Sequence, residues 1–172
     1  VPSVCESFGF FHADAEQVLA RPGARVVVDD GRRFLSRIEE KFDLITIDPP
    51  PPVEAGGSSL LYSREFYAVL RERLSDTGVL QQWFPGGEEK IAQAVVNTLK
   101  QSFPHLIVCR SFEPPHVGLH LLASHYPLKV PTIEQAIARM PEAAKADMLE
   151  WAGISFGQDF TYKLSKSLKV SS

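Results

Sequence analysis

The sequence contains few cysteines and no long apolar run, and each scarcity excludes a class of protein. Cys5 and Cys109 are the two cysteines among 172 residues. They are too few and too far apart for a disulfide framework or a zinc site, so we expect two free thiols. No apolar run reaches the length of a membrane span. We therefore expect a cytoplasmic protein with no membrane contact by this segment.

The chain also lacks a large net charge. The chain has 18 Lys and Arg against 21 Asp and Glu, which gives a net charge of −3. A charge this small does not attract nucleic acid, so we expect no nucleic-acid partner. The length and composition are those of a globular protein with one sizeable core.

Several motifs that carry chemistry are missing. Gly56-Gly57 is not followed by Lys-Ser/Thr, so it does not form a phosphate loop. The sequence has no serine nucleophile elbow and no Cys–His signature. The histidines His116, His120 and His125 lack a fixed ligand spacing, so we expect no metal.

The most informative stretch is Phe42-Asp43-Leu44-Ile45-Thr46-Ile47-Asp48, which four prolines follow. A short apolar run with these boundaries predicts a buried parallel strand in the middle of a sheet. Proline has no N–H group and cannot continue a ladder, so the strand must end near Asp48. Asp48 would then lie at the carboxyl edge, where open α/β sheets bind ligands. An aspartate that simply begins a turn before proline is an equally good interpretation.

Helix and strand patterns alternate along the rest of the chain. The expected helices lie at 12–20, 32–38, 63–74 and 88–100, with others starting at 132 and 141. The expected strands lie at 25–28, 42–48, 79–84, 106–109 and 117–123, with a turn at 76–78. The last two strands have a short connection and should pair antiparallel. The pattern predicts an α/β fold with a doubly wound sheet and an antiparallel edge.

A second acidic corner, Asp29-Asp30-Gly31, follows the strand expected at 25–28. In a parallel sheet it would project onto the same edge as Asp48. Gly31 would let a flat ligand approach while a carboxylate accepts a hydrogen bond from its exocyclic amine. On these residues alone the simpler interpretation is favoured, in which an aspartate caps the helix that begins near Arg32.

Two features near the expected edge have open interpretations. The loop at 54–62 contains glycines and ends on Leu60, Leu61 and Tyr62, so it is either a lid or an ordinary surface connection. Trp83 ends a strand and either lines a pocket or packs in the core.

Several stretches in order resemble the spermidine/spermine synthase family, namely 27–35, 42–48, 60–67 and 74–80. The resemblance covers 25–84 and extends more loosely to 123. It implies one partial domain with the Rossmann-like sheet of S-adenosylmethionine methyltransferases, in which the first two strands are missing and a C-terminal hairpin forms an antiparallel edge. Within 1–172, residues 1–24 would form a leading segment with a helix, 25–123 the core of the match, and 124–172 a helical extension and tail.

The resemblance implies a transferase that moves an aminopropyl group from decarboxylated S-adenosylmethionine to a small-molecule amine, without a metal. Asp48 matches the acid that takes a proton from the attacking amine. Asp30 and Gly31, with Asp29 beside them, match the positions that hold the adenine. The positions expected to bind the acceptor are Tyr62, Tyr67, Gln82 and Trp83.

Two departures from the family pattern bear on the acceptor. Pro51 occupies the place of the second acid of the loop, which grips the polyamine in the family. Gln82 lies one residue before the family's glutamine position, which Trp83 occupies. These departures favour an alternative, an S-adenosylmethionine-dependent methyltransferase-type enzyme with a non-polyamine acceptor. A non-catalytic relative is the third possibility.

The family's glycine-rich loop, its ribose-binding acid and its N-terminal β-hairpin domain have no counterpart in this sequence, which begins at Val1. We therefore expect a fragment that is inactive alone. The two strands without counterparts would lie between 25–28 and 44–47, leaving backbone unpaired on both sides. The fragment would borrow strands from another copy, repack, or belong to a longer polypeptide. We expect the protein to be a homo-oligomer, with a dimer as its form.

Overall fold

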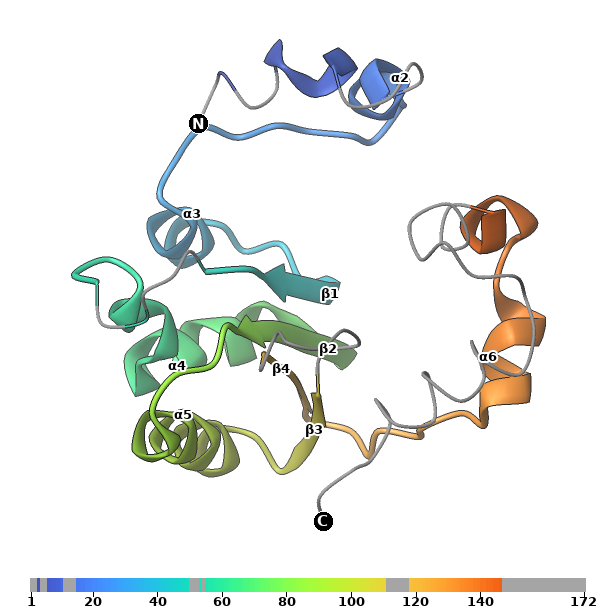
Figure 1. The fold of residues 1–172 in the computed structure, drawn as a ribbon. Coiled ribbons are helices and arrows are strands. Elements are labelled where there is room, and N and C mark those ends of the chain that lie inside the picture. The colour runs from blue at the N-terminus through green and yellow to red at the C-terminus, as the bar shows by residue number, and fades with distance from the viewer. Residues whose placement is uncertain are drawn as a thin grey trace. The chain divides into compact units, whose positions relative to one another are not determined.

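The structure, a computed structural model, describes residues 3, 6–10, 15–49, 53, 55–110 and 118–146 (Figure 1). The contacts of the chain divide it into two compact units, residues 1–38 and 39–172. The α/β architecture expected from the sequence is present in the second unit, whose sheet and helices are formed by segments that alternate along the chain.

The first unit contains η1 (Phe8–Phe10), α2 (Ala15–Ala20) and α3 (Gly31–Arg37). The two α-helices confirm the predictions at 32–38 and, for its described part, at 12–20. The strand predicted at 25–28 was wrong, because these residues have no regular structure. Val26, Val27 and Val28 are 51%, 45% and 64% exposed. β-branched residues favour a strand only where a neighbouring strand accepts their backbone hydrogen bonds, and no described segment pairs with them.

The described part of the second unit contains a sheet of four strands in the order β1-β2-β4-β3. They are β1 (Phe42–Ile47), β2 (Leu74–Phe84), β3 (His105–Arg110) and β4 (Leu119–Ser124). β1 and β2 are parallel, whereas β4 is antiparallel to both β2 and β3, which confirms the predicted edge hairpin. The prediction of a buried central position for β1 was wrong. Within the described ranges, β1 has a neighbouring strand on one side only, and Leu44 is 61% exposed.

Two helices cover one face of this sheet, α4 (Arg64–Arg73) and α5 (Glu89–Ser102), which lie side by side (Figure 1). Ser63 caps α4 as predicted, because its side chain accepts a hydrogen bond from the Phe66 N–H. The core between the helices and the sheet contains Phe66, Tyr67, Leu70, Leu80, Phe84, Val95, Leu99, Leu121 and Ala123. Alternate residues of β2 therefore face this core, and those between them face the other side.

The described part of the second unit contains further elements outside the sheet and these two helices. The 3-10 helix η2 (Ser59–Tyr62) lies directly before α4, and α6 (Ile133–Arg139) follows the sheet. The capping box predicted at the start of α6 is present, with Thr132 and Gln135 bonded reciprocally. Residues 142–146 are also helical, as the proline at 141 suggests. Within the described ranges, no helix has the length and apolar character needed to cross a membrane.

The prediction of a turn at 76–78 was wrong, because these residues are part of β2, where the ladder with β1 is irregular. Phe42 pairs with Leu74 and Leu44 pairs with Val79. Between these two pairs β2 contains more residues than β1, so the register of the ladder shifts here. A Cβ atom on Gly78 would lie 2.8 Å from the Phe42 carbonyl oxygen. Only glycine leaves room for this close approach of two backbones.

We expect Gly78→Ala to lower the free energy of unfolding by about 1–3 kcal/mol, because the new methyl group would push against backbone. Urea unfolding of the full-length protein measures the change. Gly56→Ala is the matched control, because a Cβ at that position meets nothing within 4 Å. Equal midpoints for the two variants would show that the ladder relaxes around residue 78.

Candidate active site

Asp48 lies at the end of the sheet where the parallel strands β1 and β2 both finish. Ile47 pairs with Gln82, so the next residues, Asp48 and Trp83, are neighbours at this edge. Asp48 is exposed, and no hydrogen bond or ion pair from the described part of the chain reaches its carboxylate. An exposed carboxylate without a partner is available to a cationic ligand.

Tyr62, the last residue of η2, lies close to this carboxylate. Its side chain is buried, its hydroxyl donates a 3.3 Å hydrogen bond to the Trp83 carbonyl, and its ring packs edge-on against Phe84. Burial and, to a smaller extent, the negative charge of Asp48 raise the pKa of Tyr62 to about 12. The hydroxyl therefore stays protonated at neutral pH and remains a donor.

Tyr67 and Gln82 are fully buried between α4 and β2. The Tyr67 hydroxyl donates to Gln82 Oε1 at 2.8 Å, and Gln82 Nε2 donates to the Leu61 carbonyl at 3.0 Å. Burial raises the pKa of the Tyr67 phenol, so this donor also stays protonated. In this conformation neither side chain is accessible to a substrate. Direct binding of an acceptor by these two residues stays a prediction.

Trp83 faces the opposite side of the sheet from Gln82, because successive side chains of a strand alternate. It is half-buried and pairs across the ladder with His120 of β4. Nδ1 of His120 lies 3.2 Å from Nε2 of Gln81, a contact that the sequence did not predict. Side chains alternate along the strand predicted at 79–84, so the sequence places Gln81 and Gln82 on opposite faces of the sheet. It does not show which of these faces the helices cover. Among the described residues, no three His, Cys, Asp or Glu side chains gather as a metal site.

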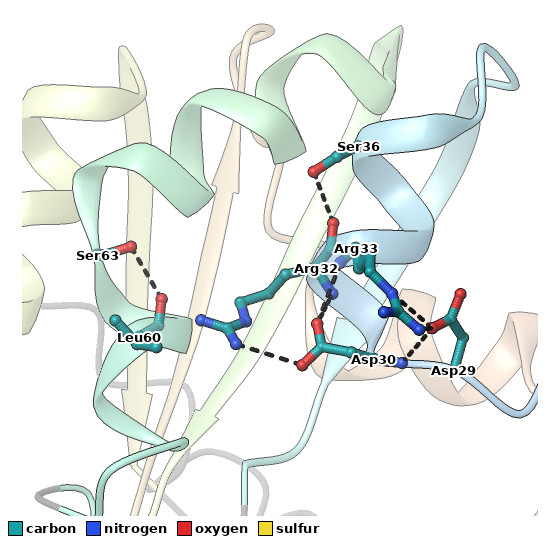
Figure 2. A network of polar contacts seen from close by, with 7 residues as sticks. All are labelled: Asp29, Asp30, Arg32, Arg33, Ser36, Leu60 and Ser63. Atoms are coloured by element: carbon teal, nitrogen blue, oxygen red, sulfur yellow. Dashed lines mark hydrogen bonds and ion pairs between the residues drawn. The ribbon is translucent and has the colours of Figure 1, made fainter.

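Asp30 caps α3 in the first unit, which is the simpler of the two interpretations of this residue (Figure 2). Its Oδ1 accepts hydrogen bonds from the N–H groups of Arg32 and Arg33 at 3.0 and 3.1 Å. Among the described residues, its Oδ2 is paired only with the Arg32 guanidinium, at 3.3 Å. The pKa of Asp30 is lowered, chiefly by the Arg33 backbone hydrogen bond and then by the Arg32 side chain. The carboxylate therefore stays ionised at neutral pH, with one oxygen held by a solvent-exposed pair.

Asp29 has a different environment, in which arginines surround its carboxylate. Its Oδ1 accepts from Nη2 and Nε of Arg33 at 2.8 and 3.1 Å, and from the Asp30 N–H at 2.8 Å (Figure 2). Its Oδ2 is paired with Arg37. The Arg33 hydrogen bond is the main cause that lowers the pKa of Asp29. Both oxygens therefore have partners within the first unit, and a role of Asp29 in holding the adenine stays a prediction.

Gly31 begins α3, and a Cβ on it would meet nothing within 4 Å. Packing within the described residues therefore does not require glycine there. The predicted site residues thus form two groups. One is the network at the start of α3. The other lies where β1 and β2 end, and it contains Asp48, Tyr62, Tyr67, Gln82 and Trp83.

The chain is similar in sequence to known polyamine-synthesising enzymes. The thermospermine synthase ACAULIS5 of Arabidopsis thaliana is 32% identical over 177 residues, covering 99% of this chain and 51% of that protein. A polyamine aminopropyltransferase of Sulfurisphaera tokodaii is 30% identical over 99 residues, covering 57% of this chain and 33% of that protein. The chain thus spans about half or less of the length of these relatives.

Two solved structures share the fold. Human methyltransferase-like protein 13, crystallised in complex with SAH, has a TM-score of 0.60 at 20% identity and covers 96% of this chain and 73% of its own. A spermidine synthase in complex with the transition state analogue AdoDATO has a TM-score of 0.58 at 18% identity, covering 83% and 57%. These likenesses show that the sheet is of the Rossmann-like methyltransferase type.

The sequence profile of one family matches most of the chain. It is described as the spermine/spermidine synthase domain and matches residues 2–119, a range that includes both groups of predicted site residues. The chain belongs to the spermine/spermidine synthase domain family.

Proposed function

We propose that the full-length protein transfers an aminopropyl group from decarboxylated S-adenosylmethionine to an amine, with Asp48 as the base. The observation that carries the proposal is the exposed carboxylate of Asp48, which has no partner among the described residues and lies where β1 and β2 end. The family match and the relatives named as aminopropyltransferases support the reaction class.

The chemistry needs one acid and correct positioning. An alkyl amine is protonated at neutral pH, so Asp48 would first bind the ammonium and then hold its proton. The neutral nitrogen attacks the aminopropyl carbon next to the sulfonium, the new C–N bond forms, and the C–S bond breaks. The electron pair of that bond returns to sulfur, which leaves as a neutral thioether. Since sulfonium is already a good leaving group, alignment supplies most of the remaining acceleration.

The co-substrate site is proposed at the start of α3. Oδ2 of Asp30 would accept a hydrogen bond from the adenine amine once Arg32 releases it, while Oδ1 continues to cap the helix. The open space next to Gly31 supports this role, because a ligand can approach its backbone. Capping and ligand binding are thus compatible functions of one carboxylate.

The acceptor we propose carries one ammonium group and an apolar body. Pro51, which lies outside the described residues, stands where the family has a second acid, and Trp83 stands where it has a glutamine. Asp48 would bind the ammonium, and the half-buried face of Trp83 beside it would contact the body of the acceptor.

A methyltransferase-type reaction is the second candidate. It is favoured by the same replacements at Pro51 and Trp83, which remove polar contacts that a polyamine would use. In this case S-adenosylmethionine would supply a methyl group, and the role of Asp48 would be unchanged. A non-catalytic relative would bind neither compound.

Calorimetric titration of the full-length protein separates these candidates. Binding of decarboxylated S-adenosylmethionine at least about tenfold tighter than S-adenosylmethionine is the expected result. The reverse preference would support methyl transfer. If neither compound gives heat of binding, both proposed reactions are contradicted and the protein is a non-catalytic relative.

A further inference from the structure

A buried chain of hydrogen bonds joins three elements next to the proposed active site. It runs from the Tyr67 hydroxyl on α4 to Gln82 Oε1 on β2, and from Gln82 Nε2 to the Leu61 carbonyl on η2. The distances are 2.8 and 3.0 Å, and both side chains are completely buried. One amide therefore acts as donor and acceptor at once, and it connects a helix, a strand and a loop segment.

Consecutive residues of η2 are attached to consecutive residues of β2. The Leu61 carbonyl is bonded to the side chain of Gln82, and the Tyr62 hydroxyl is bonded to the carbonyl of Trp83. Two adjacent attachments fix both the position and the rotation of a short 3-10 turn. Neither attachment alone would prevent the turn from pivoting.

The far side of the same turn is fixed to α4. Ser63 donates a 2.9 Å hydrogen bond to the Leu60 carbonyl (Figure 2). It also accepts a hydrogen bond from the Phe66 N–H at 3.2 Å. η2 is therefore continuous with the start of the helix that carries Tyr67. A change at Tyr67 or Gln82 would be transmitted to η2 through both of its ends.

We infer that Gln82 is a positioning residue, which acts through the Leu61 carbonyl to hold Tyr62 beside Asp48. The inference rests on the proposed function, because it assigns Gln82 to the architecture of that site and not to contact with the substrate. Tyr62 lies close enough to Asp48 for the carboxylate charge to act on its phenol. The Tyr62 hydroxyl is bonded to the carbonyl of Trp83, the residue next to Asp48 in the register, so a movement of η2 would move this phenol relative to the carboxylate.

Three substitutions in the full-length protein test this role. Tyr67→Phe keeps the ring that packs against Phe103 but removes the donor to Gln82. Gln82→Met keeps the shape of the side chain and removes both hydrogen bonds. Tyr126→Phe is the matched control, because Tyr126 is 58% exposed and lies outside this network.

The first readout is hydrogen exchange of the backbone amides at 59–63, which needs no substrate. We expect exchange there to become about tenfold faster in Tyr67→Phe and faster still in Gln82→Met, because each leaves buried polar groups unpaired. Exchange within α5 and in Tyr126→Phe should be unchanged. Unchanged exchange at 59–63, or an equal increase throughout α5, would overturn the inference.

The second readout separates positioning from binding. With an active acceptor, kcat of Tyr67→Phe should fall about tenfold while KM for the co-substrate stays the same. A change confined to KM for the acceptor would overturn the inference, because it would indicate direct contact with the substrate. If the protein shows no transfer at all, the proposed function fails, whereas the exchange result still decides whether Gln82 holds η2.

Discussion

Asp48→Asn should reduce the rate of transfer by about 10²–10⁴-fold while the protein folds normally. The amide has nearly the same shape as the carboxylate but cannot take a proton from the attacking amine. The fold should be unaffected, because Asp48 is exposed and no described residue bonds to it. Initial rates at saturating co-substrate, with circular dichroism as the folding check, measure the effect.

The loss in Asp48→Asn should shrink as the pH rises. An alkyl amine has a pKa of about 10, so its neutral fraction grows about tenfold for each pH unit below that value. A variant that lacks the base depends on acceptor amine that is already neutral. Its rate should therefore rise more steeply with pH than the rate of the wild type. Asp76→Asn, which changes an exposed aspartate of β2, is the control and should retain the original rate. A deficit that stays constant from neutral to alkaline pH would contradict the role of base.

Asp30→Asn should weaken binding of the co-substrate about tenfold or more without loss of the helix cap. The asparagine oxygen can still accept from the Arg32 and Arg33 N–H groups, as Oδ1 does now. Its NH₂ group would then take the place of Oδ2 and would face the adenine amine, donor against donor. Isothermal titration with decarboxylated S-adenosylmethionine measures the change.

Asp30→Ala separates the two roles of this residue, because it removes the cap as well. It should lower the thermal stability of α3, which Asp30→Asn should not. The cap is at full strength at neutral pH. The lowered pKa of Asp30 means that its contribution is lost only as the pH falls below the usual 3.8. Equal binding by wild type and Asp30→Asn would show that the residue is a cap and nothing more.

Local patterns predicted those parts of the fold that depend on neighbouring residues. The caps at Ser63 and Thr132 were confirmed because a cap is a contact within one turn of helix. The hairpin of β3 and β4 was confirmed because a short connection between strands leaves few alternatives. The strand at 25–28 failed because a strand requires a partner, which local sequence does not supply.

In the candidate site, too, local sequence predicted one feature and could not predict another. The position of Asp48 followed from the prolines that end β1, and it was confirmed at the end of the parallel pair. The environment of Gln82 could not be predicted, since it depends on which face of β2 the helices cover. A glutamine at the end of a strand looks the same in sequence whether it faces a substrate or, as here, a buried tyrosine.

Mass spectrometry of the reaction product shows whether the full-length protein transfers an aminopropyl group. The full-length protein is incubated with decarboxylated S-adenosylmethionine or S-adenosylmethionine, and with putrescine, spermidine or hexylamine as acceptor. We expect an acceptor to gain the mass of an aminopropyl group from the decarboxylated compound alone, and Asp48→Asn to give almost none of this product. Gain of a methyl group from S-adenosylmethionine, or no product from any combination, would contradict the proposed aminopropyl transfer.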